Sequence, residues 1–175
     1  MTAYKQLIET AHIDLGIPKD YAQKTKLTLQ TESTDLCDVG SDIYDRPQKI
    51  AQNALKPWSQ MKAQAEQDGI TINIVSVFRS VNRQIEIIQS KLDKGERIED
   101  ILKISAAPGY SEHHTGRALD LTTNDCRVLA LEFENTAAFS WLEKNAALFS
   151  FHLSYPKNNP HGISYEPWHW AYREN

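Results

Sequence analysis

The chain has 175 residues and a mass of 20.0 kDa, which is enough for one globular domain with a hydrophobic core. Its net charge of -4 leaves no basic surplus to neutralise a phosphate backbone, and no apolar run approaches the roughly 20 residues of a membrane-spanning helix. We therefore expect neither nucleic-acid binding nor membrane insertion.

Two features of the sequence are typical of a cytoplasmic protein. The first 15 residues carry several charged side chains and lack the apolar core and small-residue cleavage site of a signal peptide. Cys37 and Cys126 stand alone, without a C-x-x-C pair or a dense disulfide framework. A cytoplasmic location is the expectation that follows.

Apolar spacing predicts several helices. The segment 18–45 is polar and turn-rich, and we expect it to be irregular. From Pro47, apolar residues recur at three- and four-residue steps and predict a helix that ends at Gly69, with Pro57 bending or interrupting it. Ser80 is a suitable N-cap for a later helix that ends at Gly95. The predicted helices are 3–13, 47–69, 81–95, 98–102 and 136–149.

Between the helices lie short segments that are β-branched, alternating or continuously apolar, which is typical of strands. Together with the helices they predict an α+β fold in which a small antiparallel sheet is covered by helices. No repeat or linker divides the chain, so we expect a single domain 1–175, with a catalytic core at 47–175 and an N-terminal extension, 1–46, of unassigned role. The predicted strands are 70–77, 118–122, 151–155 and 165–172.

Two segments, 111–120 and 166–169, concentrate residues that are able to bind a metal. A catalytic zinc ion needs three protein ligands of the nitrogen or oxygen type and an open position for water. His113, Asp120 and His169 fit the ligand roles. A carboxylate that is not a ligand takes the proton of the water, and Glu166 fits this role.

The spacing makes this site plausible without requiring it. Gly116 permits a tight turn between His113 and Asp120. Glu166 and His169 would point to opposite faces of a regular strand, so a bend or bulge at Pro167 must bring them together. Isolated histidines and carboxylates are also common as ordinary surface or core residues, and the H-x6-D spacing is not specific.

Other hydrolase chemistries find less support in the sequence. No G-x-S-x-G segment marks a serine as a nucleophile. Cys126 could pair with a histidine, but nothing around it indicates a reactive thiol.

Three linked motifs resemble the VanY-type zinc carboxypeptidases of peptidoglycan, which group with the D-Ala-D-Ala and L,D-carboxypeptidases. The resemblance covers about residues 51–173 in order, and the motifs together are more specific than any one of them. Pro108-Gly109-Tyr110 and the segment 151–156 also match the family. The motifs are SVFRSVNRQ at 76–84, SEHHTGRALD at 111–120 and EPWH at 166–169.

The resemblance implies roles for individual residues. His113, Asp120 and His169 would bind one zinc ion per chain, and Glu166 would be the general base. The spacing alone does not choose between His113 and its neighbour His114, and the motif position favours His113. Several divalent metals suit two imidazoles and one carboxylate, so metal identity is open in the sequence itself.

Three further residues would contact the substrate. The resemblance places Arg79 on its terminal carboxylate or on the developing oxyanion, which suits the planar fork of a guanidinium. Gln84 and Ser111 would form hydrogen bonds with the peptide. Without the metal motifs, Arg79 would be interpreted as a surface ion-pair residue and Gln84 as part of a solvated helix face.

Three positions depart from the family pattern. Phe78 replaces the more usual Tyr and removes a hydroxyl group. Ser154 stands where many relatives have Arg, so a charged contact from that strand is lost. His114, where Gln is common, adds a second imidazole beside the expected ligand.

The function that we expect is zinc-dependent removal of the terminal D-amino acid from a muropeptide or stem peptide. Since no export signal is evident, the expectation is L,D-carboxypeptidase activity on tetrapeptides in cell-wall recycling. The alternatives are a D,D-carboxypeptidase or dipeptidase, a phage endolysin-type endopeptidase, and a catalytically inactive peptidoglycan-binding domain. The oligomeric state and the roles of His152 and His161 do not follow from the sequence.

Overall fold

The computed structural model describes residues 3–174, in which the strands form two antiparallel sheets. Four strands form the larger sheet in the order β3-β4-β6-β5, and two form the smaller sheet, β1-β2. The strands are β1 (Leu36–Ser41), β2 (Pro47–Ala51), β3 (Asn73–Ser76), β4 (Ala118–Thr122), β5 (Phe151–Leu153) and β6 (His169–Tyr172).

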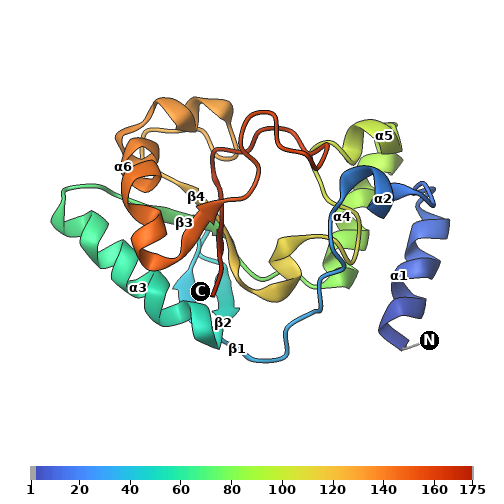
Figure 1. Cartoon of the computed structure of the whole chain (residues 1–175), viewed down its shortest axis with the longest axis horizontal. Coiled ribbons are helices and arrows are strands. Elements are labelled where there is room, and N and C mark those ends of the chain that lie inside the picture. The colour runs from blue at the N-terminus through green and yellow to red at the C-terminus, as the bar shows by residue number, and fades with distance from the viewer. Residues whose placement is uncertain (1–2, 175) are drawn as a thin grey trace.

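Helices flank the larger sheet on two sides. Figure 1 shows α3 and α6 on one side, and α1, α2, α4 and α5 gathered on the other. Among the described helices, none combines the length and apolarity needed to cross a membrane. The α-helices are α1 (Ala3–Asp14), α2 (Tyr21–Thr25), α3 (Gln52–Gln67), α4 (Val81–Asp93), α5 (Ile98–Ile101) and α6 (Ala137–Asn145), and the 3-10 helices are η1 (Glu112–Thr115), η2 (Leu131–Asn135) and η3 (Ala146–Phe149).

The main core lies between the larger sheet and helices α3 and α6. One face of α3 is buried at four positions with helical spacing, Ala54, Trp58, Met61 and Ala65. All five residues of β4 are buried, as expected for a central strand that is covered on both faces. The position of β4 is therefore strongly fixed by packing.

A second core lies on the opposite side of the molecule and includes the N-terminal segment. The hydroxyl of Tyr21 accepts a hydrogen bond of 3.1 Å from the backbone N–H of Ala107 inside this core. Residues 15–21 are thereby packed against α4, α5 and the segment that leads to η1. The buried members of this core are Leu15, Ile17, Tyr21, Ile88, Ile101, Leu102 and Ala107.

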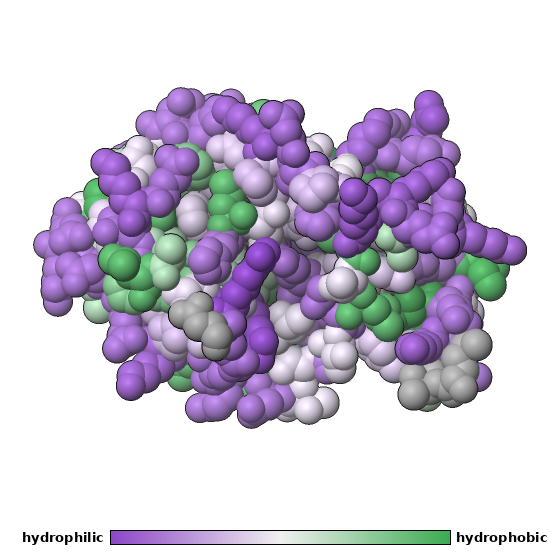
Figure 2. Space-filling view, in the orientation of Figure 1, coloured by the Kyte–Doolittle hydropathy of each residue, from purple (hydrophilic) through white to green (hydrophobic). Residues whose placement is uncertain are grey.

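The exposed surface is mostly hydrophilic on the face that Figure 2 shows. Apolar side chains there form small separated patches. Scattered exposed apolar residues are normal for a folded domain.

The structure confirms the α+β class and several elements in detail. The strand at 118–122 is found as predicted, and the hydroxyl of Ser80 caps α4 by accepting from the N–H of Arg83 at 3.1 Å. The segment 136–149 is helical with Thr136 as N-cap, but its last turn is the 3-10 helix η3.

The prediction for residues 47–51 is wrong. These residues form strand β2, and the helix begins only at Gln52. β2 pairs with β1, which precedes it in the chain, so the pairing overrides the helical spacing of the apolar side chains. We expected Pro57 to bend or interrupt the helix, and the helix continues through Pro57 without interruption.

The segment 18–45 is less irregular than predicted, because it contains α2 and β1. β1 is half exposed and its apolar residues are few, so its sequence pattern is weak. The strands expected at 70–77, 151–155 and 165–172 are present but shorter. Residues 70–72 and 77 lie outside the ladder, a bend follows β5 at 154–155, and a turn at 167–168 precedes β6.

Candidate metal centre

Strand register places three polar residues in one row across the larger sheet. Ser76 on β3 lies opposite Asp120 on β4, and Asp120 lies opposite His169 on β6. Antiparallel partners in direct opposition have Cβ atoms about 5 Å apart. The sheet thus brings together residues from three distant parts of the chain.

His113 reaches the same place from η1, which precedes β4. Gly116 ends η1 in the left-handed region, with a φ of 67°, and lets the chain turn directly into β4. The ring N–H at Nδ1 of His113 donates to the carbonyl oxygen of Val77 at 2.6 Å. Its other nitrogen, Nε2, therefore faces Asp120, with 3.2 Å to Oδ2.

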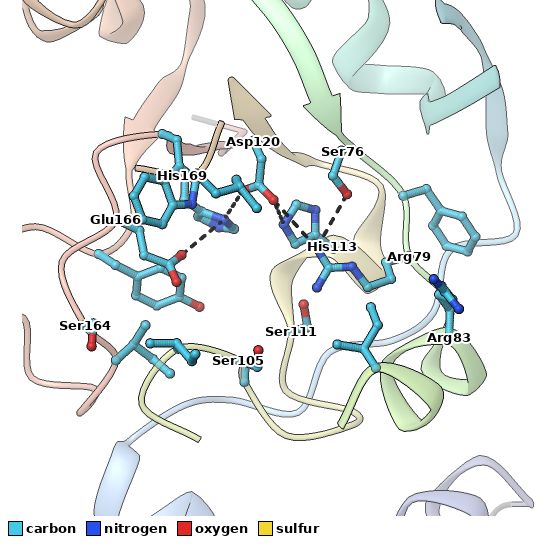
Figure 3. A pocket seen from close by; sticks show the side chains of 18 of the residues that line it. Ser76, Arg79, Arg83, Ser105, Ser111, His113, Asp120, Ser164, Glu166 and His169 are labelled. Carbon is cyan, nitrogen blue, oxygen red and sulfur yellow. Dashed lines mark hydrogen bonds and ion pairs between the residues drawn. The ribbon is translucent and has the colours of Figure 1, made fainter. Parts of the chain in front are cut away.

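These residues form a compact set of donor atoms. One donor atom from each of His113, Asp120 and His169 lies within 4.8 Å of the other two, and all three residues are buried. Nδ1 of His169 is 3.0 Å from Oδ1 of Asp120. Figure 3 shows the three side chains pointing toward one another at the wall of a cavity. Two imidazole nitrogens and one carboxylate oxygen fit a catalytic zinc ion.

Glu112 is a residue of this centre to which the sequence analysis assigned no role. Its Oε2 is 2.9 Å from Nε2 of His169. A carboxylate that accepts the N–H of a metal-binding histidine fixes the tautomer and the orientation of the ring. Its place next to His113 in the motif was visible in the sequence, but its contact with β6 was not.

Charge and burial act in opposite directions on these groups. Burial alone would lower the pKa of His169, but hydrogen bonds to Asp120 and Glu112 outweigh it and raise the pKa to about 10. For Asp120, burial raises the pKa, but His113 and His169 outweigh it and hold it well below its usual range. The carboxylate of Asp120 is therefore ionised and available to a cation at neutral pH.

A turn before β6 places Glu166 beside His169. The backbone N–H of His169 donates to the carbonyl of Glu166 at 3.1 Å, which closes the turn at Pro167 and confirms the expected bend. Oε2 of Glu166 is 3.8 Å from Nδ1 of His169. Burial, reinforced by Asp120, raises the pKa of Glu166 to about 7, near the range in which a general base is most effective.

Arg79 lies beside Asp120, 3.6 Å from its Oδ2. Its guanidinium donates to Oε1 of Gln84 at 2.9 Å and to the hydroxyl of Ser76 at 3.5 Å. Gln84 is fully buried and also donates to the carbonyl of Ala106, so the structure places it behind Arg79 rather than at the cavity surface. Gln84 thus holds the guanidinium in place.

The other positions from the sequence analysis are found near the centre. Ser111 and Phe78 line the cavity. His114 is fully buried, where its Nδ1–H donates to the carbonyl of Arg79 and its Nε2 accepts from the N–H of Gly109. Both ring nitrogens of His114 form hydrogen bonds with backbone groups, whereas Nε2 of His113 faces Asp120. Ser154 is buried near the end of β5, with its N–H directed to the carbonyl of His169.

The cavity has a volume of about 690 Å³ and extends beyond the metal centre. The sequence analysis did not identify Tyr155, Lys91 or Ser105, which also line it. Tyr155 lies with its ring centroid 4.9 Å from that of His169. Tyr155 lies in the segment 151–156 that matches the family, but no motif in the sequence singles out Lys91 or Ser105, and only the fold brings these two residues to the cavity.

Comparison with known proteins assigns the chain to a family. Residues 47–175 match the family model described as VanY, D-alanyl-D-alanine carboxypeptidase. The chain belongs to the VanY family.

Individual relatives agree with this VanY assignment. The putative carboxypeptidase YodJ from Bacillus subtilis (strain 168) is 36% identical over 149 residues, which cover 81% of this chain and 54% of YodJ. The chain thus spans about half the length of that relative. The solved structure of the LdcB LD-carboxypeptidase, described as revealing the basis of peptidoglycan recognition, is 32% identical, with a TM-score of 0.72 over 82% of this chain and 70% of LdcB.

A more distant VanY structure shares the fold. It is a point mutant of the vancomycin resistance D,D-pentapeptidase VanY in complex with Zn(II), at 24% identity and a TM-score of 0.59, covering 86% of this chain and 80% of that one.

Proposed function

We propose that this VanY-family chain is a zinc-dependent carboxypeptidase that removes the terminal D-amino acid from peptidoglycan stem peptides. The observation that carries the proposal is the cluster of His113, Asp120 and His169 donors, with the carboxylate of Glu166 3.8 Å from one of them. The likeness to LdcB and the description of the family model support the substrate class.

The chemistry follows from the positions of these residues. Bound zinc would lower the pKa of a water molecule and polarise the scissile carbonyl. Glu166 takes the proton of the attacking water and passes it to the leaving amine, a role that suits a carboxylate with a pKa of about 7. Arg79, which is fixed by Gln84 and Ser76, places a positive charge where the oxyanion develops.

For specificity we propose L,D-carboxypeptidase activity on tetrapeptides. The support is LdcB, an LD-carboxypeptidase that is 32% identical to this chain. D,D-carboxypeptidase activity is the second candidate, and the description of the matching family model favours it. Incubating the zinc-loaded chain separately with tetrapeptide and pentapeptide stems, with products read by mass, distinguishes them. Release of D-Ala from the pentapeptide alone would support the second candidate.

The base assignment has its own test. We expect Glu166→Ala to lower kcat by about 100- to 10,000-fold because proton transfer to a positioned side chain is lost. Zinc content, measured by mass spectrometry of the metal, should match that of the parent protein. Glu9→Ala, which changes an exposed acid on α1, is the matched control and should keep full activity. Normal turnover by Glu166→Ala would refute the assignment.

The remaining expectations from the sequence are also open to experiment. A purified chain that takes up no zinc, and that is inactive after zinc is added, would support the alternative of a non-catalytic peptidoglycan-binding domain. The cytoplasmic location and the role in wall recycling stay predictions, which fractionation of cells and analysis of turnover peptides in a deletion strain would test.

A further inference from the structure

The segment 26–35 connects α2 to β1 and lies before the region that matches the VanY family model. These residues contain no helix or strand, but hydrogen bonds fix them at several points. The N–H of Gln30 donates to the carbonyl of Gly109 at 2.7 Å, and the N–H of Ser33 donates to the carbonyl of His114 at 2.9 Å. The segment therefore lies along η1 and along the chain that leads into it.

One side chain of this segment, Glu32, reaches helix α4. Its Oε2 accepts a hydrogen bond of 2.6 Å from the backbone N–H of Val81, the first residue of α4. The first N–H groups of a helix have no partner within the helix, and the helix dipole favours a carboxylate at this end. Figure 1 shows the chain between α2 and β1 passing beside α4. Glu32 therefore joins the start of α4 to a segment 49 residues away in the chain.

The start of α4 also carries the groups that hold Arg79. The N–H of Arg79 donates to the carbonyl of His113 at 3.1 Å, and its carbonyl accepts from Nδ1 of His114 at 2.6 Å. Its guanidinium donates to Oε1 of Gln84 at 2.9 Å. Gln84 lies in the first turn of α4, where its N–H donates to the carbonyl of Ser80 at 3.0 Å. The position of the guanidinium thus depends on where α4 begins.

We propose that Glu32 is a positioning residue for Arg79. Its bond to Val81 sets the start of α4, and Gln84 passes this position on to the guanidinium, which lies 3.6 Å from Oδ2 of Asp120. This inference rests on the proposed carboxypeptidase function, in which Arg79 faces the developing oxyanion. A misplacement of about 1 Å at a reacting group costs about 100-fold in rate. Glu32 acts without touching the substrate.

This role predicts a specific kinetic effect. The oxyanion develops only in the transition state, so a misplaced guanidinium lowers kcat and has little effect on KM. If Glu32 acts through Arg79, its loss has no further effect once the guanidinium is absent. A carboxylate that served only the stability of the fold would reduce activity equally with and without Arg79.

The test is a double-mutant cycle on the zinc-loaded chain, with the stem peptide that the wild type hydrolyses. Glu32→Ala removes the acceptor of the Val81 N–H, and Glu32→Gln keeps an oxygen acceptor. Arg79→Met removes the guanidinium and keeps an unbranched side chain. Asp35→Ala is the matched control, since it removes an exposed acid from the same segment. Thermal melts and zinc content confirm that each variant is folded and loaded.

We expect Glu32→Ala to lower kcat by about 10- to 100-fold and to change KM by less than about twofold. Glu32→Gln and Asp35→Ala should retain most of kcat. In the Arg79→Met background, Glu32→Ala should lower kcat by less than a further factor of about two. If Glu32→Ala does not fold, Glu32→Asp, which withdraws the carboxylate by one methylene, takes its place in the cycle. An unchanged kcat, or the same fold-loss with and without Arg79, would overturn the proposal.

A second measurement does not depend on turnover. The NMR signals of the guanidinium N–H groups of Arg79, assigned by their absence in Arg79→Met, report the surroundings of this group. We expect Glu32→Ala to shift these signals and Asp35→Ala to leave them unchanged. If the wild type releases no D-Ala and Glu32→Ala shifts the signals, the carboxypeptidase function is wrong and the positioning role is retained. If the wild type is active and Glu32→Ala changes neither the signals nor kcat, the positioning role is wrong and the function is retained.

Discussion

The carboxylate of Glu112 accepts a hydrogen bond from Nε2 of His169, while Nδ1 of the same ring faces Asp120. Burial raises the pKa of Glu112, but the hydrogen bond and charge of His169 outweigh it and lower the pKa to about 2. The carboxylate is therefore ionised at neutral pH, and it also lies 3.9 Å from the guanidinium of Arg173. An acceptor in this position keeps the proton on Nε2, so that a metal ion would displace the proton of Nδ1 and bind there.

This contact predicts that zinc affinity depends on Glu112. We expect Glu112→Ala to weaken zinc binding by about 10- to 100-fold, as is usual when the partner of a metal-binding histidine is removed. Glu112→Gln should have a smaller effect, because the amide oxygen still accepts a hydrogen bond. Competition with a chromophoric chelator measures the affinity, with Glu66→Gln on the exposed face of α3 as control. An unchanged affinity in the Ala variant would contradict this role.

At the scale of elements, the smaller sheet supports the turn between His113 and Asp120. The backbone N–H of Ala51 on β2 donates to the carbonyl of Gly116 at 2.8 Å. A Cβ built on Gly116 would lie 2.7 Å from Cδ2 of Leu36 and 2.9 Å from the backbone nitrogen of Ala51. The β1-β2 sheet thus packs directly against the turn, and Leu36, which precedes the matched region 47–175, takes part in this contact.

Gly116→Ala tests this packing. We expect it to lower the free energy of unfolding by about 2 kcal/mol or more, because it adds a collision with backbone to the strain of a positive φ. Denaturant unfolding of the metal-free protein measures the change. Gly95→Ala is the matched control, since Gly95 has a φ of 84° but no atom within 4 Å of the added Cβ. Equal losses in the two variants would show that the collision is relieved without cost.

At the scale of the whole molecule, the N-terminal segment stabilises the chain that leads to the metal centre. Nε2 of His12 on α1 is 2.8 Å from the carbonyl of Pro108, and Tyr21 bonds to Ala107. These contacts fix residues 107–110 immediately before Ser111. The second core therefore couples the N-terminal helices to one wall of the cavity.

His12 makes this coupling dependent on pH. Burial lowers its pKa below the ordinary value, although the hydrogen bond to Pro108 acts in the opposite direction. The unfolded chain therefore binds a proton more readily, and the stability that His12 contributes is present above about pH 6.5 and is lost as the pH falls through its folded-state pKa.

We expect the value of Tm at about pH 7.5 minus Tm at about pH 5.5, a window around the ordinary histidine pKa, to be smaller in His12→Gln than in the wild type, as measured by calorimetry of the metal-free protein. Other groups contribute with both signs: burial lowers the pKa of His114 to about 4 and favours the higher pH, whereas the raised pKa values of His169, about 10, and Glu166, about 7, favour the lower pH. An identical difference in the variant and the wild type would show that His12 does not contribute.

The sequence by itself predicted the chemistry of the centre and determined the elements with strong local signals. Two imidazoles and two carboxylates at motif positions predicted the metal donors and the base. An apolar run predicted β4, and a capping serine predicted the start of α4. These features depend on residues that are near one another in the chain, so their signals are local.

Only the tertiary structure decided which distant residues share the centre. The pairing of β1 with β2, the contact of Glu112 with His169, and the approach of Lys91 to the cavity each join segments that are separated along the chain. The free energy of such contacts comes from register and packing between elements. The periodicity of a single sequence carries no information on this pairing between elements. For this reason a helix was predicted for residues 47–51, where the structure has strand β2.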